Sequence, residues 1–398
     1  MPVCSPVIKD GAVAVSNGRI LAVGRNCLLQ AQFVNAEIKN YQGVLLPGLV
    51  NAHIHLELSA FTDIAPPASG QSFCDWIRSL LQVRQQGHLE PAELARVAGE
   101  TLQQQHATGV GLLLDIGNVL PSTSASLVTF LLELLGPTGK AEEQVLARLA
   151  ALPDTVAATA HAPYSTTAGI MTALKHRADR LGHVFSLHVA ESADEIELLG
   201  SGHGCFRAFL EERDAWDHRF PVPTLESPGT VEYLDHLGLL AANLLCVHCV
   251  HVSEKEVQLL AAHNCKVCLC PGSNRFLGSG IAPVELMLRH GLLPAIGTDS
   301  AASNVELDLW REMQILHEDH SQVSAALILS MATIGGAQAI GRDHDFGTLA
   351  PGRKAMLLNV DSPALQEAQD GGQLLDILTG SGRPESIGWI EETAEIGS

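Results

Sequence analysis

The chain has 398 residues, of which 46% are hydrophobic and 17% charged, a composition typical of a globular protein with a large core. A formal charge of -20 repels phosphate backbones and argues against a nucleic-acid polymer as partner. No apolar run reaches the roughly 18 residues of a membrane span, and residues 1–10 lack a signal-peptide pattern. Nine cysteines, an odd number, do not resemble a secreted disulfide framework. We therefore predict a cytoplasmic protein with reduced thiols and no membrane contact.

Both ends of the chain have the pattern of β-structure. Residues 11–24, GAVAVSNGRILAVG, predict two short strands joined at Asn17-Gly18, because Asn-Gly between alternating apolar residues is a strong hairpin signal. Residues 354–361, KAMLLNVD, are strand-like and follow a turn-rich segment at 347–353.

The middle of the chain alternates between short apolar runs and segments with helical spacing. Residues 90–105, for example, predict a helix with Pro91 in its first turn. Eight runs in βα alternation indicate a parallel sheet, and eight strands close a (β/α)8 barrel. The runs are LLPGLVNAH, GVGLLLDIG, SLVTFLLELLG, DTVAATAH, HVFSLHVAE, NLLCVHCV, CKVCLCP and LLPAIGTD.

Polar residues interrupt these runs at their C-terminal ends, where buried parallel strands should stay apolar. They are His53 and His55 in the first run, His161 in the fourth, His188 in the fifth, His248 in the sixth and Asp299 in the eighth. A single strand-end histidine is more often structural than a ligand. Several on one rim favour a site instead, because unpaired imidazoles are costly to bury together and the C-terminal strand ends of a barrel face its active site.

Imidazole and carboxylate ligands suit zinc or iron(II), and a catalytic site leaves one position for water. Three histidines and one aspartate would hold one divalent ion whose bound water ionises nearer neutrality. Glu191 follows His188 by three residues and is a candidate proton carrier. A carboxylate favoured by the dipole of a helix start is the alternative explanation of Glu191.

Two other metal patterns are rejected. Cys246, Cys249, Cys265 and Cys268 have the spacing of a zinc ribbon, but both pairs lie in strand-like runs where residues three apart face opposite sides. We expect buried thiols there. His55-Leu56-Glu57 matches half of the cytidine-deaminase signature, but no P-C-x-x-C follows, which excludes that fold.

Six motifs in order resemble the amidohydrolase superfamily, nearest to its deaminase and chlorohydrolase branch. They are PGLVNAHIH (47–55), HAPYS (161–165), LHVAE (187–191), HCVHVS (248–253), PGSN (271–274) and GTDSAASN (297–304). The resemblance implies a catalytic barrel over residues 46–345 and a small β-sandwich built from residues 1–45 and 346–398.

The resemblance also implies roles for single residues. His53, His55, His188 and Asp299 would be the metal ligands. Glu191 would shuttle a proton to a ring nitrogen, His248 would orient the hydrolytic water, and Asp299 would also act as base. His161 would contact substrate. The run at 154–161 lacks the lysine of binuclear relatives, which favours a single metal ion. Met356 stands where the family usually has an acidic residue, and we expect only a local packing change.

Several loops resemble aminodeoxyfutalosine deaminases of menaquinone biosynthesis, among them HLELS (55–59) and SFCDWIRSLL (72–81). They imply that the 6-amino group of an adenine-type nucleoside is replaced by oxygen, with release of ammonia. Glu57, Trp76 and Ser303 are predicted to contact this purine nucleoside. A loop carboxylate in an ion pair would explain Glu57, and a plain amphipathic helix would explain Trp76.

Different substrates on the same scaffold stay open. Adenosine, methylthioadenosine or S-adenosylhomocysteine deaminases, guanine or pterin deaminases and triazine-type chlorohydrolases share the metal machinery, and pocket loops choose among them. A catalytically silent barrel that binds a partner is disfavoured by the retained ligands, acid and base. A homodimer is also left open.

Overall fold

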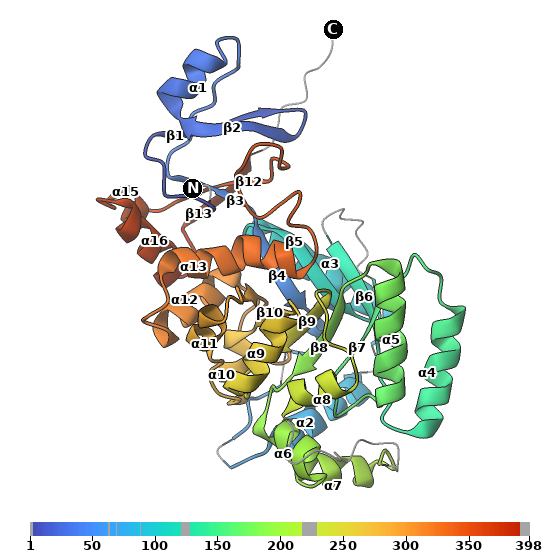
Figure 1. Ribbon diagram of the computed structural model, residues 1–398. Coiled ribbons are helices and arrows are strands. Elements are labelled where there is room, and N and C mark those ends of the chain that lie inside the picture. Colours follow the sequence, from blue (N-terminus) through green and yellow to red (C-terminus); the bar gives the residue numbers. More distant parts are fainter. Residues whose placement is uncertain are drawn as a thin grey trace.

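The computed structural model describes residues 3–62, 64–68, 70–87, 89–120, 128–216 and 229–390. Eight buried strands lie at the centre of an α/β fold, one in each predicted apolar run (Figure 1). Ser126 and Leu127 of the third predicted run lie outside the described residues, as do residues 391–398. The strands are β4 (Leu49–Ile54), β5 (Val110–Gly117), β6 (Val128–Leu134), β7 (Ala158–Ala160), β8 (Phe185–Val189), β9 (Leu244–His248), β10 (Lys266–Leu269) and β11 (Ala295–Ile296).

These strands form two four-stranded parallel sheets, in the orders β4-β5-β6-β7 and β8-β9-β10-β11. Backbone contacts connect the sheets at both edges. The amide of His188 donates to the carbonyl of His161 (3.0 Å), and the amide of Asp299 donates to the carbonyl of His53 (3.1 Å). The polar C-terminal ends of strands from both sheets therefore lie side by side.

Helices surround the strands. The predicted helix at 90–105 is confirmed as α3 (Pro91–Ala107), with Pro91 in its first turn. In Figure 1, α2, α6 and α7 lie together at the lower end of the molecule. The other helices of this part are α2 (Phe73–Gly87), α4 (Gly139–Ala151), α5 (Ala168–Leu181), α6 (Ala193–Ser201), α7 (Cys205–Glu212), α8 (Thr230–His236), α9 (Glu254–Ala262), α10 (Pro271–Leu277), α11 (Val284–Arg289), α12 (Leu309–Asp319), α13 (Ala325–Ser330) and α14 (Gly336–Ala339). The short 3-10 helix η1 (Leu56–Ala60) follows β4, and the π-helical turn η2 (Met331–Gly335) joins α13 to α14.

The two ends of the chain pair with each other. The predicted hairpin is confirmed as β1 (Gly11–Ser16) and β2 (Arg19–Arg25), because Asn17 and Gly18 both adopt the positive φ that its turn requires. β12 (Leu357–Asp361), in the predicted segment 354–361, pairs antiparallel with β3 (Val44–Pro47) and β13 (Ser386–Ile390). Three helices without a sequence prediction accompany them: α1 (Asn26–Gln32), α15 (Pro363–Gln366) and α16 (Gly371–Gly380).

Met356 packs at the N-terminal ends of β4 and β5, away from the polar strand ends. A side chain on Gly111 would collide with the Met356 sulfur, and one on Gly48 would come within 2.9 Å of its methyl group. An apolar residue fits this contact, in agreement with the expectation of a local packing change.

The cysteines divide into a pair and seven free thiols. Cys74 of α2 and Cys205 of α7 form a disulfide, so the prediction of reduced thiols throughout is wrong for this pair. The two cysteines lie 131 residues apart, and only the tertiary structure brings α2 and α7 together. The four cysteines of the rejected zinc-ribbon pattern are buried and free, and no candidate metal group of the described residues contains one. No helix in the described ranges is long and apolar enough to span a membrane.

Candidate active site

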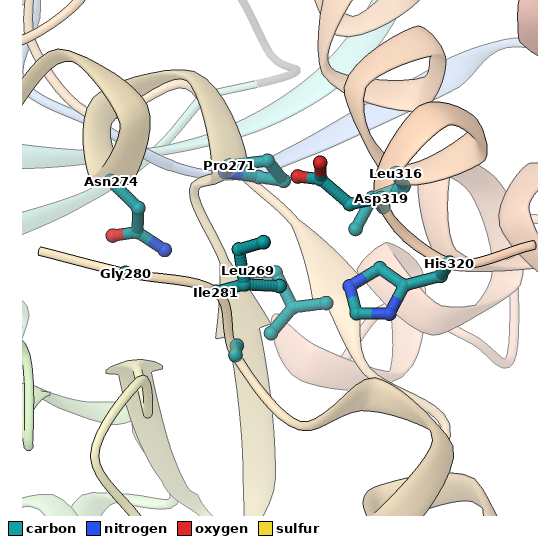
Figure 2. A pocket seen from close by; sticks show the side chains of 9 residues that line it. Leu269, Pro271, Asn274, Gly280, Ile281, Leu316, Asp319 and His320 are labelled. Carbon is teal, nitrogen blue, oxygen red and sulfur yellow. The ribbon is translucent and has the colours of Figure 1, made fainter. Parts of the chain in front are cut away.

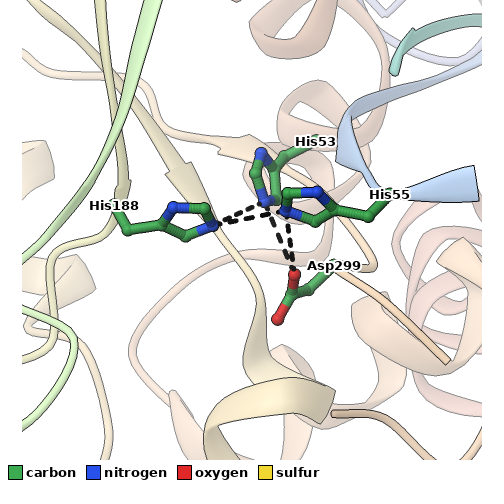
Figure 3. A group of neighbouring side chains, drawn as sticks. All are labelled: His53, His55, His188 and Asp299. Carbon is green, nitrogen blue, oxygen red and sulfur yellow. Dashed lines mark hydrogen bonds and ion pairs between the residues drawn. The ribbon is translucent and has the colours of Figure 1, made fainter. Parts of the chain in front are cut away.

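Four side chains from the two sheets meet at the polar strand ends (Figure 3). His188 Nε2 lies 3.2 Å from His53 Nε2 and 3.4 Å from His55 Nε2. Asp299 Oδ1 lies 3.5 Å from His53 Nε2 and 3.6 Å from His55 Nε2. His53 is fully buried, and the other three are at most 6% exposed. The four predicted metal ligands therefore point at one common centre.

This arrangement fits a divalent metal ion. A tetrahedral ion with ligands at about 2.0–2.1 Å separates neighbouring ligand atoms by about 3.3 Å, close to the spacings found here. Without an ion, lone pairs of three imidazoles would face each other in a buried space. Burial, opposed by a hydrogen bond to Asp299, lowers the pKa of His53 well below its ordinary value. Neutral imidazoles are the form that binds metal.

Hydrogen bonds from neighbouring groups orient two of the candidate ligands. His188 Nδ1 donates to the carbonyl of His161 (2.9 Å), which leaves its Nε2 lone pair for the cluster. Asp299 Oδ2 accepts hydrogen bonds from the hydroxyls of Ser273 and Ser303, each at 2.7 Å. Ser303, predicted to bind substrate, thus has a contact with Asp299 that holds the carboxylate in place. Ser273 lies in the PGSN motif, but its role went unpredicted.

The backbone at these strand ends is strained. Ala190, His248 and Asp299 adopt φ values of 52°, 72° and 58°, a region in which residues other than glycine cost roughly 1–3 kcal/mol each. Beside Asp299, Gly297 runs so close to β4 that a Cβ would lie 2.7 Å from the carbonyl of His53. Tertiary contacts therefore hold β8, β9 and β11 in conformations that turn their terminal side chains inward.

Glu191, His248 and Asp299 form a second buried group beside the cluster. His248 Nδ1 donates to Asn274 Oδ1 (2.9 Å), so its Nε2 is free and lies 3.5 Å from Glu191 Oε1. Burial lowers the pKa of His248 to about 4. Burial, and then the charges of Asp299 and Glu195, raise the pKa of Glu191 well above its ordinary value. An imidazole whose burial favours the neutral form and a carboxyl group whose burial favours the protonated form are thus placed next to each other.

Asp299 has the opposite tendency. Burial by itself would raise its pKa, but the hydrogen bond to His53 and the nearby histidines hold the pKa well below its ordinary value. The pKa values of two buried carboxyl groups in one site are therefore shifted in opposite directions, which separates a candidate acid from a candidate base or ligand.

Glu195, in the first turn of α6, holds the backbone that carries Glu191. Its Oε1 accepts hydrogen bonds from the amide of Ala190 (2.8 Å) and the hydroxyl of Thr230 (2.7 Å), and its Oε2 accepts one from the amide of Glu191 (3.0 Å). Burial raises the pKa of Glu195 to about 7. Sequence reasoning missed this residue, since a carboxylate in a first helical turn is ordinarily explained by the helix dipole.

We expect Glu195→Gln to lower kcat at least about tenfold and the free energy of unfolding by about 1–3 kcal/mol. Glutamine offers one acceptor oxygen to groups that need two, so an amide donor would face the backbone amide of Glu191 or Ala190. Steady-state kinetics and thermal unfolding measure the two effects. Glu197→Gln, an exposed change on the same helix, is the control. An unchanged kcat would contradict a positioning role for Glu195.

Of the other residues predicted to bind substrate, His161 lies beside the cluster and Trp76 packs within α2. The His161 ring centroid lies 4.7 Å from that of His188, and His161 Nδ1 lies 2.7 Å from the Ser165 hydroxyl. Burial lowers the pKa of His161 to about 4. Trp76 packs against Phe73 in α2 (ring centroids 5.7 Å apart), and its indole N–H is buried without a hydrogen-bond partner.

Glu57 has a structural contact. It lies in η1, and its Oε2 accepts a hydrogen bond from the backbone amide of Asn118 (2.8 Å), next to the end of β5. The carboxylate of Glu57 therefore helps to hold the loop after β5. This role is similar to the ion-paired loop carboxylate considered from the sequence, except that the partner is a backbone amide.

Asn274 also lines a small pocket between α10 and the end of α12 (Figure 2). Leu316 and His320 line the pocket on the side of α12, and Ile281 lines it next to Leu269. The pocket has room for roughly one water molecule, so it cannot hold a purine.

Comparison with known proteins gives matches over most of the chain. The model of the amidohydrolase family matches residues 44–387. A 5-methylthioadenosine/S-adenosylhomocysteine deaminase of Syntrophobacter fumaroxidans is 32% identical over 390 residues, covering 88% of this chain and 80% of the relative. The enzyme of the same name from Nitratidesulfovibrio vulgaris is 30% identical over 388 residues, covering 89% and 80%.

Solved structures share the fold. An adenosine deaminase from Xanthomonas campestris with bound zinc has a TM-score of 0.76 at 24% identity, covering 96% of this chain and 87% of that one. The Helicobacter pylori aminofutalosine deaminase in complex with methylthio-coformycin has a TM-score of 0.77 at 23% identity, covering 96% and 94%. A triazine hydrolase from Arthrobacter aurescens has a TM-score of 0.74 at 19% identity, covering 95% and 88%.

Proposed function

Because this chain belongs to the amidohydrolase family, we propose that it is a metal-dependent hydrolytic deaminase that converts the 6-amino group of an adenine nucleoside to an oxo group. One observation carries the proposal. A buried carboxyl group whose pKa is raised, Glu191, lies 3.5 Å from an imidazole whose pKa is lowered, His248, beside a cluster that fits a metal ion. Hydrolysis of a cyclic amidine requires a proton for the ring nitrogen next to the attacked carbon, and Glu191 is placed to donate it.

Each residue of the site has a separate role in the proposed reaction. His53, His55, His188 and Asp299 would hold one divalent ion, zinc or iron(II), which supplies a water molecule that ionises near neutral pH. Glu191 donates its proton to the ring nitrogen beside the carbon under attack. His248, neutral and anchored by Asn274, orients the attacking water through Nε2. Asp299 accepts one proton of the water and passes it to the amino group, which leaves as ammonia. The second proton of the water leaves the new hydroxyl group as the carbonyl forms and returns to Glu191. His161 contacts the far edge of the base.

The proposal extends to the domains. The eight strands β4 to β11 would close a (β/α)8 barrel over residues 46–345, and residues 1–45 with 346–398 would form the small β-sandwich. The backbone hydrogen bonds from His188 to His161 and from Asp299 to His53, at the two places where the sheets meet, support closure. The pairing of β3 with β12 supports a unit built from both ends.

For the substrate we propose an adenine nucleoside modified at its 5′ position. The loop motifs favour 6-amino-6-deoxyfutalosine. The two named relatives act, by their names, on methylthioadenosine and S-adenosylhomocysteine, and these two nucleosides are the alternative. All share the adenine ring and the ribose. A triazine-type chlorohydrolase activity is less well supported, because both named relatives are deaminases by their names.

A substrate panel tests the function. Metal-analysed protein is assayed for ammonia release from aminodeoxyfutalosine, methylthioadenosine, S-adenosylhomocysteine, adenosine and guanine, and for chloride release from a chlorotriazine. We expect the highest kcat/KM for one of the first three compounds. Activity on guanine or chlorotriazine, with none on any adenine nucleoside, would overturn the proposal.

A further inference from the structure

Glu133 is a carboxylate beside the metal cluster that no step above uses. It lies on β6, in register with Thr159 of β7. Thr159 precedes His161 by two residues. Its oxygen, a nitrogen of His161 and a nitrogen of His188 all lie within 4.8 Å of one another. Glu133 Oε1 is buried and has no hydrogen-bond partner. A buried carboxylate oxygen without a donor is costly, so it requires an explanation.

A second metal ion does not explain Glu133. Both nitrogens of His188 are engaged, since Nε2 points at His53 and His55 and Nδ1 donates to the carbonyl of His161. Only Glu133 and one nitrogen of His161 would remain as ligands, because His161 Nδ1 pairs with the hydroxyl of Ser165. Two protein ligands are fewer than the three that catalytic zinc sites use.

The order of the strands gives the position of Glu133 relative to a base bound beside Glu191 and His161. Glu191 follows β8, His161 follows β7, and Glu133 lies on β6, so the three occupy successive positions around the rim. An adenine ring whose N1 faces Glu191 and whose N3 faces His161 would carry its sugar beyond N3, toward β6. In a ribonucleoside whose base is in the anti conformation, the 2′-hydroxyl is the sugar hydroxyl nearest to N3.

We propose that Glu133 accepts a hydrogen bond from the ribose 2′-hydroxyl of the substrate and thereby selects ribonucleosides over deoxynucleosides. This inference rests on the proposed function, since it assumes an adenine nucleoside. The contact involves the sugar, which does not change during the reaction. It therefore contributes equally to ground-state and transition-state binding and affects KM more than kcat.

The test compares Glu133→Ala with wild type on adenosine and 2′-deoxyadenosine. We expect the substitution to raise KM for adenosine about 10- to 100-fold, with kcat changed less than about threefold. The KM for 2′-deoxyadenosine should stay as in wild type, because the lost contact is already absent. Glu197→Ala, an exposed change, is the matched control. Equal losses on both nucleosides, or a loss confined to kcat, would overturn the proposal.

Binding measured by calorimetry gives a readout that does not depend on turnover. Coformycin should bind wild type more tightly than 2′-deoxycoformycin, and Glu133→Ala should remove most of that difference while metal content stays at one ion per chain. Loss of metal from the Glu133→Ala protein would instead identify Glu133 as a metal ligand and overturn the assignment. If the wild-type protein neither binds coformycin nor deaminates any adenine nucleoside, the proposed function itself is refuted. This result needs no variant, so it is distinguishable from a failure of the Glu133 assignment.

Discussion

Glu191→Gln should lower kcat on the best adenine nucleoside by about 10²–10⁴-fold, the range of a single proton-transfer group. Glutamine keeps the shape of the side chain but cannot deliver a proton to the ring nitrogen. Because Glu191 is not among the four residues that converge on the metal position, metal content and thermal stability should stay near wild type. Steady-state kinetics, metal analysis and thermal unfolding measure the three quantities.

The pH profile checks the direction of the Glu191 pKa. Burial and the charges of Asp299 and Glu195 raise its pKa, so the group keeps its proton to a higher pH than an ordinary carboxyl group and loses it as the pH rises through the raised pKa. Wild-type kcat should therefore fall on the alkaline side, and this arm should be absent from the residual activity of Glu191→Gln. Glu197→Gln should match wild type. A kcat within threefold of wild type for Glu191→Gln would exclude Glu191 as the acid.

His188→Ala should abolish detectable turnover and reduce bound metal from one ion per chain to a small fraction of that. His188 Nε2 is the atom that lies within 3.4 Å of both other imidazoles, so its removal opens the cluster on one side. If His188 is a metal ligand, as we propose, its loss prevents tight metal binding, and the melting temperature should become insensitive to added zinc or iron(II). Metal analysis after dialysis and thermal unfolding with and without metal measure both effects.

His176→Ala, an exposed change on α5, is the control for histidine removal and should keep both metal and activity. Treatment of the wild type with a chelator should reproduce the loss of activity, and one equivalent of metal should restore it. Full activity of His188→Ala at wild-type metal content would contradict the assignment of this cluster. Two ions per wild-type chain would contradict the single-metal prediction.

The sequence predicted the strands well because buried parallel strands have an unambiguous pattern. Each of the eight apolar runs holds one strand, and the Asn17-Gly18 turn joins β1 to β2. The four ligand candidates could be found for the same reason, since a histidine or aspartate at the end of an apolar strand stands out. Their convergence followed from one geometric rule, that parallel strands end on the same side.

Other features had no local signal. The carboxyl groups of Glu195 and Glu133 look like ordinary helix and strand residues until the fold sets one beneath the Glu191 backbone and the other beside His161. The disulfide between Cys74 and Cys205 joins segments that are distant in sequence, and an odd cysteine count gave no reason to expect it.

The sequence by itself therefore determined the type of fold, the residues that meet at the strand ends and the chemistry that these residue types allow, because periodicity and residue identity are local properties. Only the tertiary structure decided the direction in which each pKa is shifted and which buried groups lack a hydrogen-bond partner. Those properties depend on burial and on charges brought together from distant segments, as with Glu191 between Asp299 and Glu195. The left-handed backbone at Ala190, His248 and Asp299 belongs to the same class, since only surrounding contacts can maintain that strain.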